Sequence, residues 1–76
     1  MEIPEQFLCP ITLELMEEPV TCEDGNTYEK NAILEYLSKK SVSPLTNQPI
    51  GKMTIPNRVL KELIEEFKLK RNKQLN

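Results

Sequence analysis

Prolines divide this chain into segments and limit where helices can form. They fall in three stretches, Ile3–Val20, Ser43–Ile50 and Ile55–Phe67. Proline lacks a backbone N–H and disfavours helical geometry in the residue before it, so the first two stretches are expected to be loops or extended chain. A helical pattern at Thr27–Lys39 lies between them. Two apolar loops that flank one helix favour a docking surface over a catalytic cleft.

Metal and disulfide staples are scarce in this sequence. A chain of 76 residues makes one small domain, which buries only about 60% of its unfolded surface, and many domains of this size use metals or disulfides. The chain has two cysteines, Cys9 and Cys22, and no histidine, whereas a structural zinc site needs about four such ligands. We therefore predict no metal and no cofactor. A Cys9–Cys22 disulfide remains an alternative, but without a sign of secretion we expect two reduced, partly buried thiols.

The charges of the chain are unevenly distributed. Residues 1–37 carry nine acids and one lysine, whereas residues 38–76 carry nine bases and three acids, for a net charge of −2. The basic end lacks interleaved aromatic residues, so we expect no nucleic-acid partner and interpret residues 70–76 as a helix end or linker. The acidic start and the lack of a ~20-residue apolar run predict no signal peptide and no membrane partner. We expect a soluble protein of the cytoplasm, or of a host-cell cytoplasm if it is a secreted effector.

The local patterns predict an α+β fold. Val20–Thr21 and Thr27–Tyr28 read as short strands joined by a turn that contains Asp-Gly, a strong hairpin signal. A central helix should begin near Tyr28 or Glu29 with Thr27 as its N-cap, and a third strand should lie within Gly51–Ile55. Asn57 is placed to cap the last helix.

Apolar residues at helical spacing predict the buried faces of both helices. In the central helix they are Ala32, Ile33, Tyr36 and Leu37, with Leu34 pointing away from the core. In the last helix they are Val59, Leu60, Leu63, Ile64 and Phe67.

The order and spacing of three motifs, IPEQFLCPITLELMEEPV, SPLTNQPI and IPNRVLKELIEEF, resemble the U-box domain, the zinc-free relative of the RING domain of ubiquitin ligases. The resemblance covers residues 3–69 and implies one small RING-like domain over residues 1–76, with two long loops and no metal. It also implies a polar network where a RING holds its metals. The expected contributors are Glu14, Cys22, Asp24, Glu29, Ser43, Thr46 and Asn47.

The U-box resemblance further implies a ubiquitin transferase that acts as a scaffold. Such a domain binds a ubiquitin-conjugating enzyme carrying ubiquitin and promotes transfer to a substrate lysine, the substrate being held by regions outside this chain. Residue by residue, Ile11 and Leu13 match the anchor on the first loop, Pro44 and Leu45 the opposing wall, and Tyr36 the helix side of the groove. The alternation of Ile11, Leu13 and Leu15 with polar residues by itself favours core positions for all three, and the resemblance reverses this for Ile11 and Leu13 but not for Leu15, so the core alternative stays open.

Asn47 occupies the position where many ligases carry a linchpin arginine, which bridges the conjugating enzyme and its ubiquitin. Asparagine has less reach and no charge. It also favours turns by bonding its own backbone, which is an equal alternative here.

A covalent mechanism is not indicated. A reactive cysteine needs a lowered pKa, commonly from a histidine or another cation, and Cys22 instead lies beside Glu23 and Asp24. Neither cysteine is therefore expected to carry ubiquitin, and no catalytic residue is predicted. The alternative to the ligase hypothesis is a non-catalytic U-box-like scaffold or dimerisation module, with homodimer formation left open.

Overall fold

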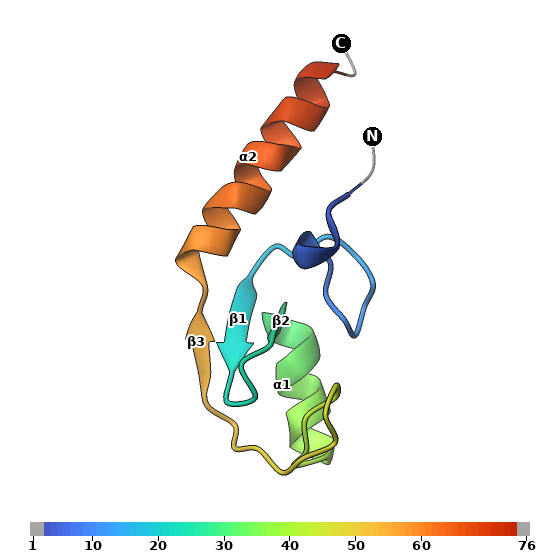
Figure 1. Cartoon of the computed structure of the whole chain (residues 1–76), viewed down its shortest axis with the longest axis vertical. Coiled ribbons are helices and arrows are strands. Elements are labelled where there is room, and N and C mark those ends of the chain that lie inside the picture. The colour runs from blue at the N-terminus through green and yellow to red at the C-terminus, as the bar shows by residue number, and fades with distance from the viewer. Residues whose placement is uncertain (1–2, 75–76) are drawn as a thin grey trace.

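The structure, a computed structural model, describes residues 3–74, which contain two helices, three short strands and one 3-10 turn. In chain order these are η1 (Glu5–Phe7), β1 (Pro19–Cys22), β2 (Thr27–Glu29), α1 (Lys30–Lys39), β3 (Thr54–Pro56) and α2 (Arg58–Gln74). Figure 1 shows the small sheet in the middle of the molecule, between α1 and α2. The arrangement confirms the α+β class predicted from the sequence.

The central strand of the antiparallel sheet is β1, in the order β2-β1-β3. Val20 lies opposite Tyr28 on one side and opposite Pro56 on the other. The predicted Asp-Gly turn joins β1 to β2, and Gly25 has a φ of 80°, a conformation that side chains other than glycine rarely adopt. The hairpin predicted from the sequence is therefore confirmed.

Helix α1 begins later than the sequence indicated. Thr27 and Tyr28 pair with β1 as part of β2, and the first helical residue is Lys30. Thr27 is therefore not the N-cap, and Glu29, which occupies that position, makes no capping bond with its side chain. The prediction failed because strand pairing holds residues 27–29 extended, which overrides a local capping preference.

The third strand and the last helix follow each other without a loop. Strand β3 forms an edge of the sheet and ends at Pro56, one residue beyond the predicted range, and Asn57 donates its backbone N–H to the Pro19 carbonyl at 2.9 Å. The Asn57 Oδ1 accepts the Leu60 N–H at 3.0 Å, which confirms the predicted cap. Helix α2 continues to Gln74, so residues 70–74 of the predicted tail are helical. Residues 75–76 lie outside the described residues.

The hydrophobic core lies between α1, the inner face of the sheet and the start of the chain. Tyr28 and Ile33 are fully buried at its centre. Among the residues that the structure describes, the buried apolar ones are Phe7, Cys9, Met16, Val20, Cys22, Tyr28, Ile33, Leu37 and Ile64. Both cysteines are free, as expected.

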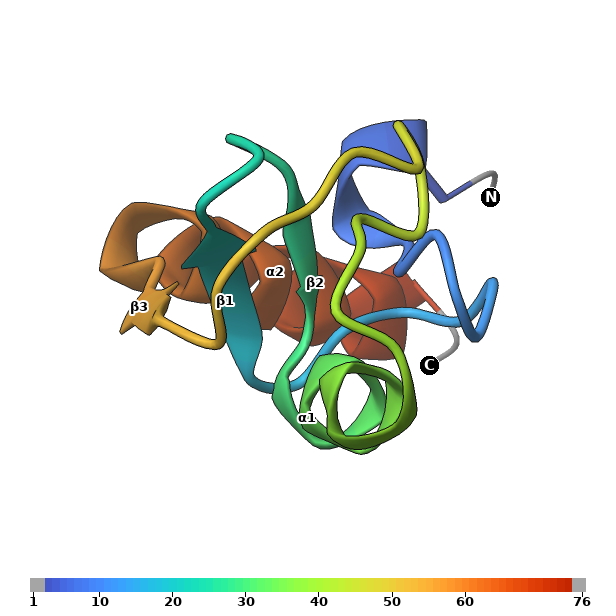
Figure 2. The same cartoon turned by 90° about the horizontal axis from the view of Figure 1, so that it is seen from below.

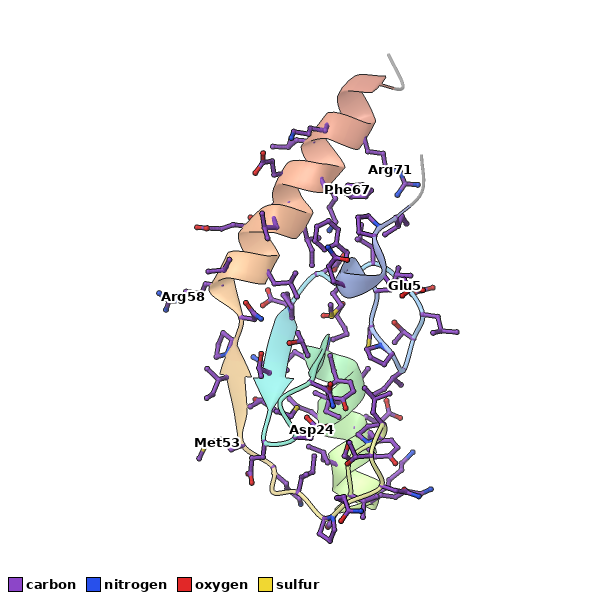
Figure 3. All side chains as sticks on the ribbon, viewed as in Figure 1. Glu5, Asp24, Met53, Arg58, Phe67 and Arg71 are labelled. Carbon is purple, nitrogen blue, oxygen red and sulfur yellow. The ribbon has the colours of Figure 1, made fainter. Side chains whose placement is uncertain are left out.

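Helix α2 buries a much narrower face than its apolar pattern predicts. Ile64 is only 1% exposed, whereas Val59 is 70% exposed and Leu63 is also exposed. The predicted stripe is therefore wrong at Val59 and Leu63. The reason is that α2 contacts the rest of the domain along one line, through β1 and through Phe67. The ring of Phe67 meets the ring of Phe7 edge-on, with 5.5 Å between the ring centroids. Figure 3 shows Phe67 on the side of α2 that faces the N-terminal segment.

The domain is elongated, with extents of 45 × 19 × 17 Å, because α2 projects past the sheet. The two long loops, residues 8–18 (loop 1) and residues 41–50 (loop 2), both lie on the side away from β3 in Figures 1 and 2. Within residues 3–74, neither helix has the length and apolarity needed to cross a membrane. The fold thus gathers both irregular segments beside α1.

Since Ile64 is the one described residue of α2 that is fully buried, we expect Ile64→Ala to destabilise the domain by about 2–4 kcal/mol, as typical for a large-to-small core substitution. Val59→Ala removes apolar atoms from an exposed site of the same helix and should change the free energy of unfolding by less than about 0.5 kcal/mol. Urea unfolding followed by circular dichroism measures both. Equal effects of the two variants would show that α2 is not docked through Ile64.

Candidate docking site

Loop 1 is closed by short-range hydrogen bonds of its own backbone. The Cys9 N–H donates to the Glu14 carbonyl at 2.9 Å, and the Leu13 N–H donates to the Cys9 carbonyl at 2.7 Å. Leu13 has a φ of 59°, which is unusual for a leucine, and its side chain is 74% exposed at the tip. The loop therefore presents an apolar residue to solvent in a constrained conformation.

The end of β2 and loop 1 are joined by three hydrogen bonds, and a fourth lies within loop 1. The Glu29 carboxylate accepts the backbone N–H groups of Glu17 and Glu18 at 2.9 and 2.8 Å. The Cys9 Sγ accepts the N–H of Glu29 at 3.2 Å and that of Ile11 at 3.4 Å. Together these contacts fix both ends of loop 1 against the residue that precedes α1.

Loop 2 is organised around a buried serine. Ser43 is 0% exposed, and its Oγ accepts the backbone N–H groups of Leu45 at 3.1 Å and Thr46 at 3.0 Å. The Ser43 carbonyl accepts the Asn47 N–H at 2.9 Å, and Asn47 has a φ of 63°, which asparagine tolerates better than most residues. The turn after Ser43 is thus held by one hydroxyl and one carbonyl.

The Asp24 carboxylate connects loop 2 to the hairpin. Its Oδ2 accepts the Ser43 hydroxyl at 2.6 Å and the Tyr28 hydroxyl at 2.7 Å, while its Oδ1 accepts the Asn26 N–H at 2.9 Å. Figure 3 shows Asp24 at the turn of the β1–β2 hairpin. Every buried side-chain N or O atom of the described residues has a partner, as the cost of unpaired groups requires.

These contacts shift the pKa of two groups in opposite directions. Burial by itself would raise the pKa of Asp24, but the hydrogen bonds from Ser43, Tyr28 and Asn26 together outweigh it and lower the pKa below 3.8. Burial, followed by the hydrogen bond to Asp24, raises the pKa of Tyr28 to about 12. Asp24 is therefore ionised and Tyr28 a proton donor at neutral pH.

The predicted polar network is partly present. Asp24, Glu29 and Ser43 have the expected tethering role, and the Thr46 hydroxyl accepts only the nearby Gln48 N–H at 3.2 Å. Glu14 and Cys22 do not belong to the network among the described residues, because Glu14 takes part in loop 1 only through its backbone and Cys22 packs in the core.

Two members of the network were not foreseen. Cys9 was expected to be a partly buried apolar residue and Tyr28 a strand residue, yet each also makes a polar tether. The signal for Tyr28 was its place four residues after Asp24, just beyond the turn, which brings its hydroxyl to the carboxylate. No comparable signal marks Cys9, whose partner Glu29 is 20 residues away.

A groove of about 340 Å³ lies between loop 1 and α1. Its lining residues are Ile11, Thr12, Ala32, Glu35, Tyr36 and Lys39. Ile11 packs partly against the core and is partly open to the groove, so it combines the two roles considered from the sequence. The structure thus brings together Ile11 and Tyr36 from segments 25 positions apart.

The other residues predicted for the docking face lie outside the lining of this groove. Leu13 and Leu45 are both exposed, at 74% and 55%, and Pro44 is half-buried in loop 2. Leu15 is half-buried and packs against the core. Asn47 is exposed at the end of the turn that Ser43 organises. A smaller groove of about 210 Å³ between η1 and α2 is lined by Phe7, Leu63, Glu66, Phe67 and Lys70.

The chemistry of the two cysteines does not favour nucleophilic attack. Both are buried, and burial, with the nearby charges of Asp24 and Glu23, raises the pKa of the Cys22 thiol to about 11. The Cys9 sulfur faces two backbone donors inside the fold. Within residues 3–74 no three His, Cys, Asp or Glu side chains cluster as metal ligands would.

Comparison with known proteins identifies relatives of most of the chain. The family model described as "U-box domain" matches residues 3–73. The chain is 50% identical over 64 residues to the "Probable bifunctional E2/E3 enzyme R795" of Acanthamoeba polyphaga mimivirus, which covers 84% of this chain and 5% of that protein. It is 46% identical to the human "WD repeat, SAM and U-box domain-containing protein 1", over 86% of this chain and 14% of that one.

One further curated protein and one solved structure are also similar to most of the chain. The "E3 ubiquitin-protein ligase PUB24" of Arabidopsis thaliana is 41% identical over 88% of this chain, which corresponds to 15% of its own length. Among solved structures, the RING finger-like domain of Retinoblastoma Binding Protein-6 superposes with a TM-score of 0.80 at 27% identity, covering 87% of this chain and 77% of that one. The chain thus spans between a twentieth and a seventh of the three curated relatives named here.

The pKa of Asp24 in the folded state lies below its unfolded value of 3.8. Its contribution to stability is therefore complete above pH 3.8 and is lost as the pH falls through the folded pKa. We expect Asp24→Asn to lower the free energy of unfolding at pH 7 by about 1–3 kcal/mol, since a donor in the network loses its charged acceptor. The difference from wild type should shrink as the pH falls below 3.8. Urea unfolding at pH 7 and pH 3 measures it. The exposed neighbour Glu23, replaced in Glu23→Gln, is the control, and a pH-independent Asp24→Asn effect would contradict the carboxylate's role.

Proposed function

Since this chain belongs to the U-box family, we propose that it is a ubiquitin-ligase module that binds a ubiquitin-loaded conjugating enzyme without forming a covalent bond. It then promotes transfer of ubiquitin to a lysine of a substrate that other protein regions hold. The observation that carries this proposal is the groove between loop 1 and α1, where Ile11 and Tyr36 meet. These are two of the positions at which a U-box is expected to contact its conjugating enzyme.

The groove provides the apolar surface that such docking requires. Ile11, Ala32 and Tyr36 form its apolar part, and the exposed Leu13 at the tip of loop 1 extends the apolar surface. Loop 2 adds Pro44 and Leu45, held in place by the bonds of Ser43 to Asp24 and to the turn. A loop that is already ordered loses little conformational entropy on binding, which favours association.

The domain would accelerate transfer by restricting the geometry of its partner. The buried thiols, one with a raised pKa, make neither cysteine a suitable carrier of ubiquitin. Binding that holds the loaded enzyme in a reactive arrangement lowers the entropic part of the barrier. We expect the contact face to bury at most about 1,200 Å² in total, which suits a transient partner that leaves to be recharged.

We expect Ile11→Ala and Pro44→Ala each to slow the discharge of a ubiquitin-loaded conjugating enzyme about tenfold, the effect of losing ~1.4 kcal/mol of binding. A single-turnover assay with free lysine as acceptor measures it. Because Ile11 also touches the core, Leu45→Ala, at an exposed position, tests the same surface without loss of packing. Leu34→Ala, on α1 but outside the groove lining, should leave the rate unchanged. Wild-type rates in all the docking-face variants, with the fold intact, would refute the proposal.

Asn47 gives a second test of the ligase mechanism. If its side chain bridges the conjugating enzyme and ubiquitin, Asn47→Arg should raise the discharge rate several-fold, because a guanidinium reaches further and donates more hydrogen bonds. The matched control is Asn47→Gly, which accepts the φ of 63° but has no side chain, and it should be slower than wild type. Discharge by the arginine variant at or below the wild-type rate would remove Asn47 from the mechanism.

A second candidate function is a non-catalytic scaffold or homodimer. Met53 before β3, Ile55 on β3 and Val59 at the start of α2 are exposed apolar residues outside the lining of the groove. Figure 3 shows Met53 at the outer side of the molecule. A domain that activates none of a broad panel of conjugating enzymes, yet elutes as a dimer, would favour this function over the ligase.

A further inference from the structure

The groove between loop 1 and α1 carries a pair of opposite charges on its α1 side. Glu35 and Lys39 both line it, one helical turn apart, and their side chains meet at 3.5 Å between Oε1 and Nζ. Tyr36 lies between them in sequence and forms part of the apolar surface. A partner that covers the apolar part of the groove must therefore approach both charges.

The Glu35–Lys39 pair is open to competition. The two side chains are 72% and 74% exposed, so water screens their attraction, and such pairs contribute little to stability. Either charge can form a new pair with a group on an incoming protein at small cost. The fold itself does not require this pair, because the buried residues of α1 are Ile33 and Leu37.

The loop 1 side of the groove is acidic. Loop 1 contributes Glu14, Glu17 and Glu18, all exposed, and no basic residue. Lys39 is the one cation among the residues that line the groove, and Glu35 is the one anion. The field around the groove therefore favours a partner of positive charge, and Lys39 opposes it.

We propose that this groove selects conjugating enzymes whose docking face is basic, and that Glu35 and Lys39 set the strength of this selection in opposite directions. The inference rests on the proposed ligase function and adds the chemistry of the preferred partner. Glu35 attracts a basic side chain at the groove, whereas Lys39 repels it. Charges at the rim of an interface act mainly on the rate of association and on its salt dependence.

The experiment measures association rate constants by stopped flow for two conjugating enzymes, one with a basic and one with an acidic docking face. For the basic one, Glu35→Lys should lower the association rate about three- to tenfold in dilute buffer, and Lys39→Glu should raise it by a similar factor. The acidic one should respond in the reverse sense. In 0.5 M NaCl, where the Debye length falls to a few ångströms, the differences should shrink below about twofold.

Helix α2 offers a matched control. Glu66 and Lys70 form an ion pair with the same spacing and similar exposure, at 3.3 Å, and they line the other groove. Glu66→Lys and Lys70→Glu change the net charge of the domain by the same amounts and should alter the rates by less than twofold. The double variant Glu35→Lys/Lys39→Glu keeps both the net charge and an ion pair, so it should fall between the two single variants.

The outcomes are separable. Equal effects at the two pairs, or shifts of the same sign in Glu35→Lys and Lys39→Glu, would overturn the charge selection while binding through Ile11 leaves the ligase function standing. If the wild type binds no conjugating enzyme, both the function and this inference fail.

Discussion

One carboxylate holds the two halves of this domain together. Asp24, at the turn of the hairpin, accepts a hydrogen bond from the Tyr28 hydroxyl in the next strand and another from the Ser43 hydroxyl in loop 2. Ser43 in turn fixes the backbone of the residues that follow it. Both cysteines are free, so no disulfide joins loop 2 to the hairpin. The hydrogen bond between Ser43 and Asp24 links them instead. The shape of one side of the candidate docking surface therefore depends on a single side chain at a surface turn.

Loop 1 is secured by the same kind of chemistry with different groups. Glu29 uses its carboxylate to accept two consecutive backbone donors, and Cys9 uses its sulfur to accept two more. The hydrogen bonds to the Glu29 carboxylate are short, at 2.9 and 2.8 Å, and directional, so they can position a loop as a metal does. They differ from a metal in that they need no cofactor and in that their strength varies with the ionisation of acidic groups. The tether of loop 1 at Glu29 and the tether of loop 2 at Asp24 both start from residues of the hairpin. The sheet therefore positions both loops.

The sequence predicted the parts of the fold that depend on local chemistry. The Asp-Gly turn and the cap at Asn57 followed from residue types and their spacing. The start of α1 could not be predicted in this way, because Thr27 is a good cap in isolation and only the pairing of β2 with β1 shows that it is a strand residue. The prediction that Val59 and Leu63 are buried was wrong for a similar reason. Periodicity identifies the apolar face of a helix but not how much of that face a neighbouring element covers. At the site, the family resemblance selected Ile11 and Tyr36, which line the same groove. The hydrogen bonds of Cys9 and the ion pair of Glu35 with Lys39 were not predicted from the sequence, because they are seen only in the three-dimensional structure.

The position of Pro56 in β3 has a consequence for how this small sheet behaves among other proteins. Asn57 bonds to Pro19 across the sheet, so the alternation of an antiparallel pair turns the backbone groups of Thr54 and residue 56 outward. Residue 56 is a proline and has no N–H to offer there. A foreign strand approaching this side would find one amide donor, too few to extend the ladder. This edge is thereby protected from edge-to-edge aggregation, although Ile55 of the same strand is an exposed apolar residue.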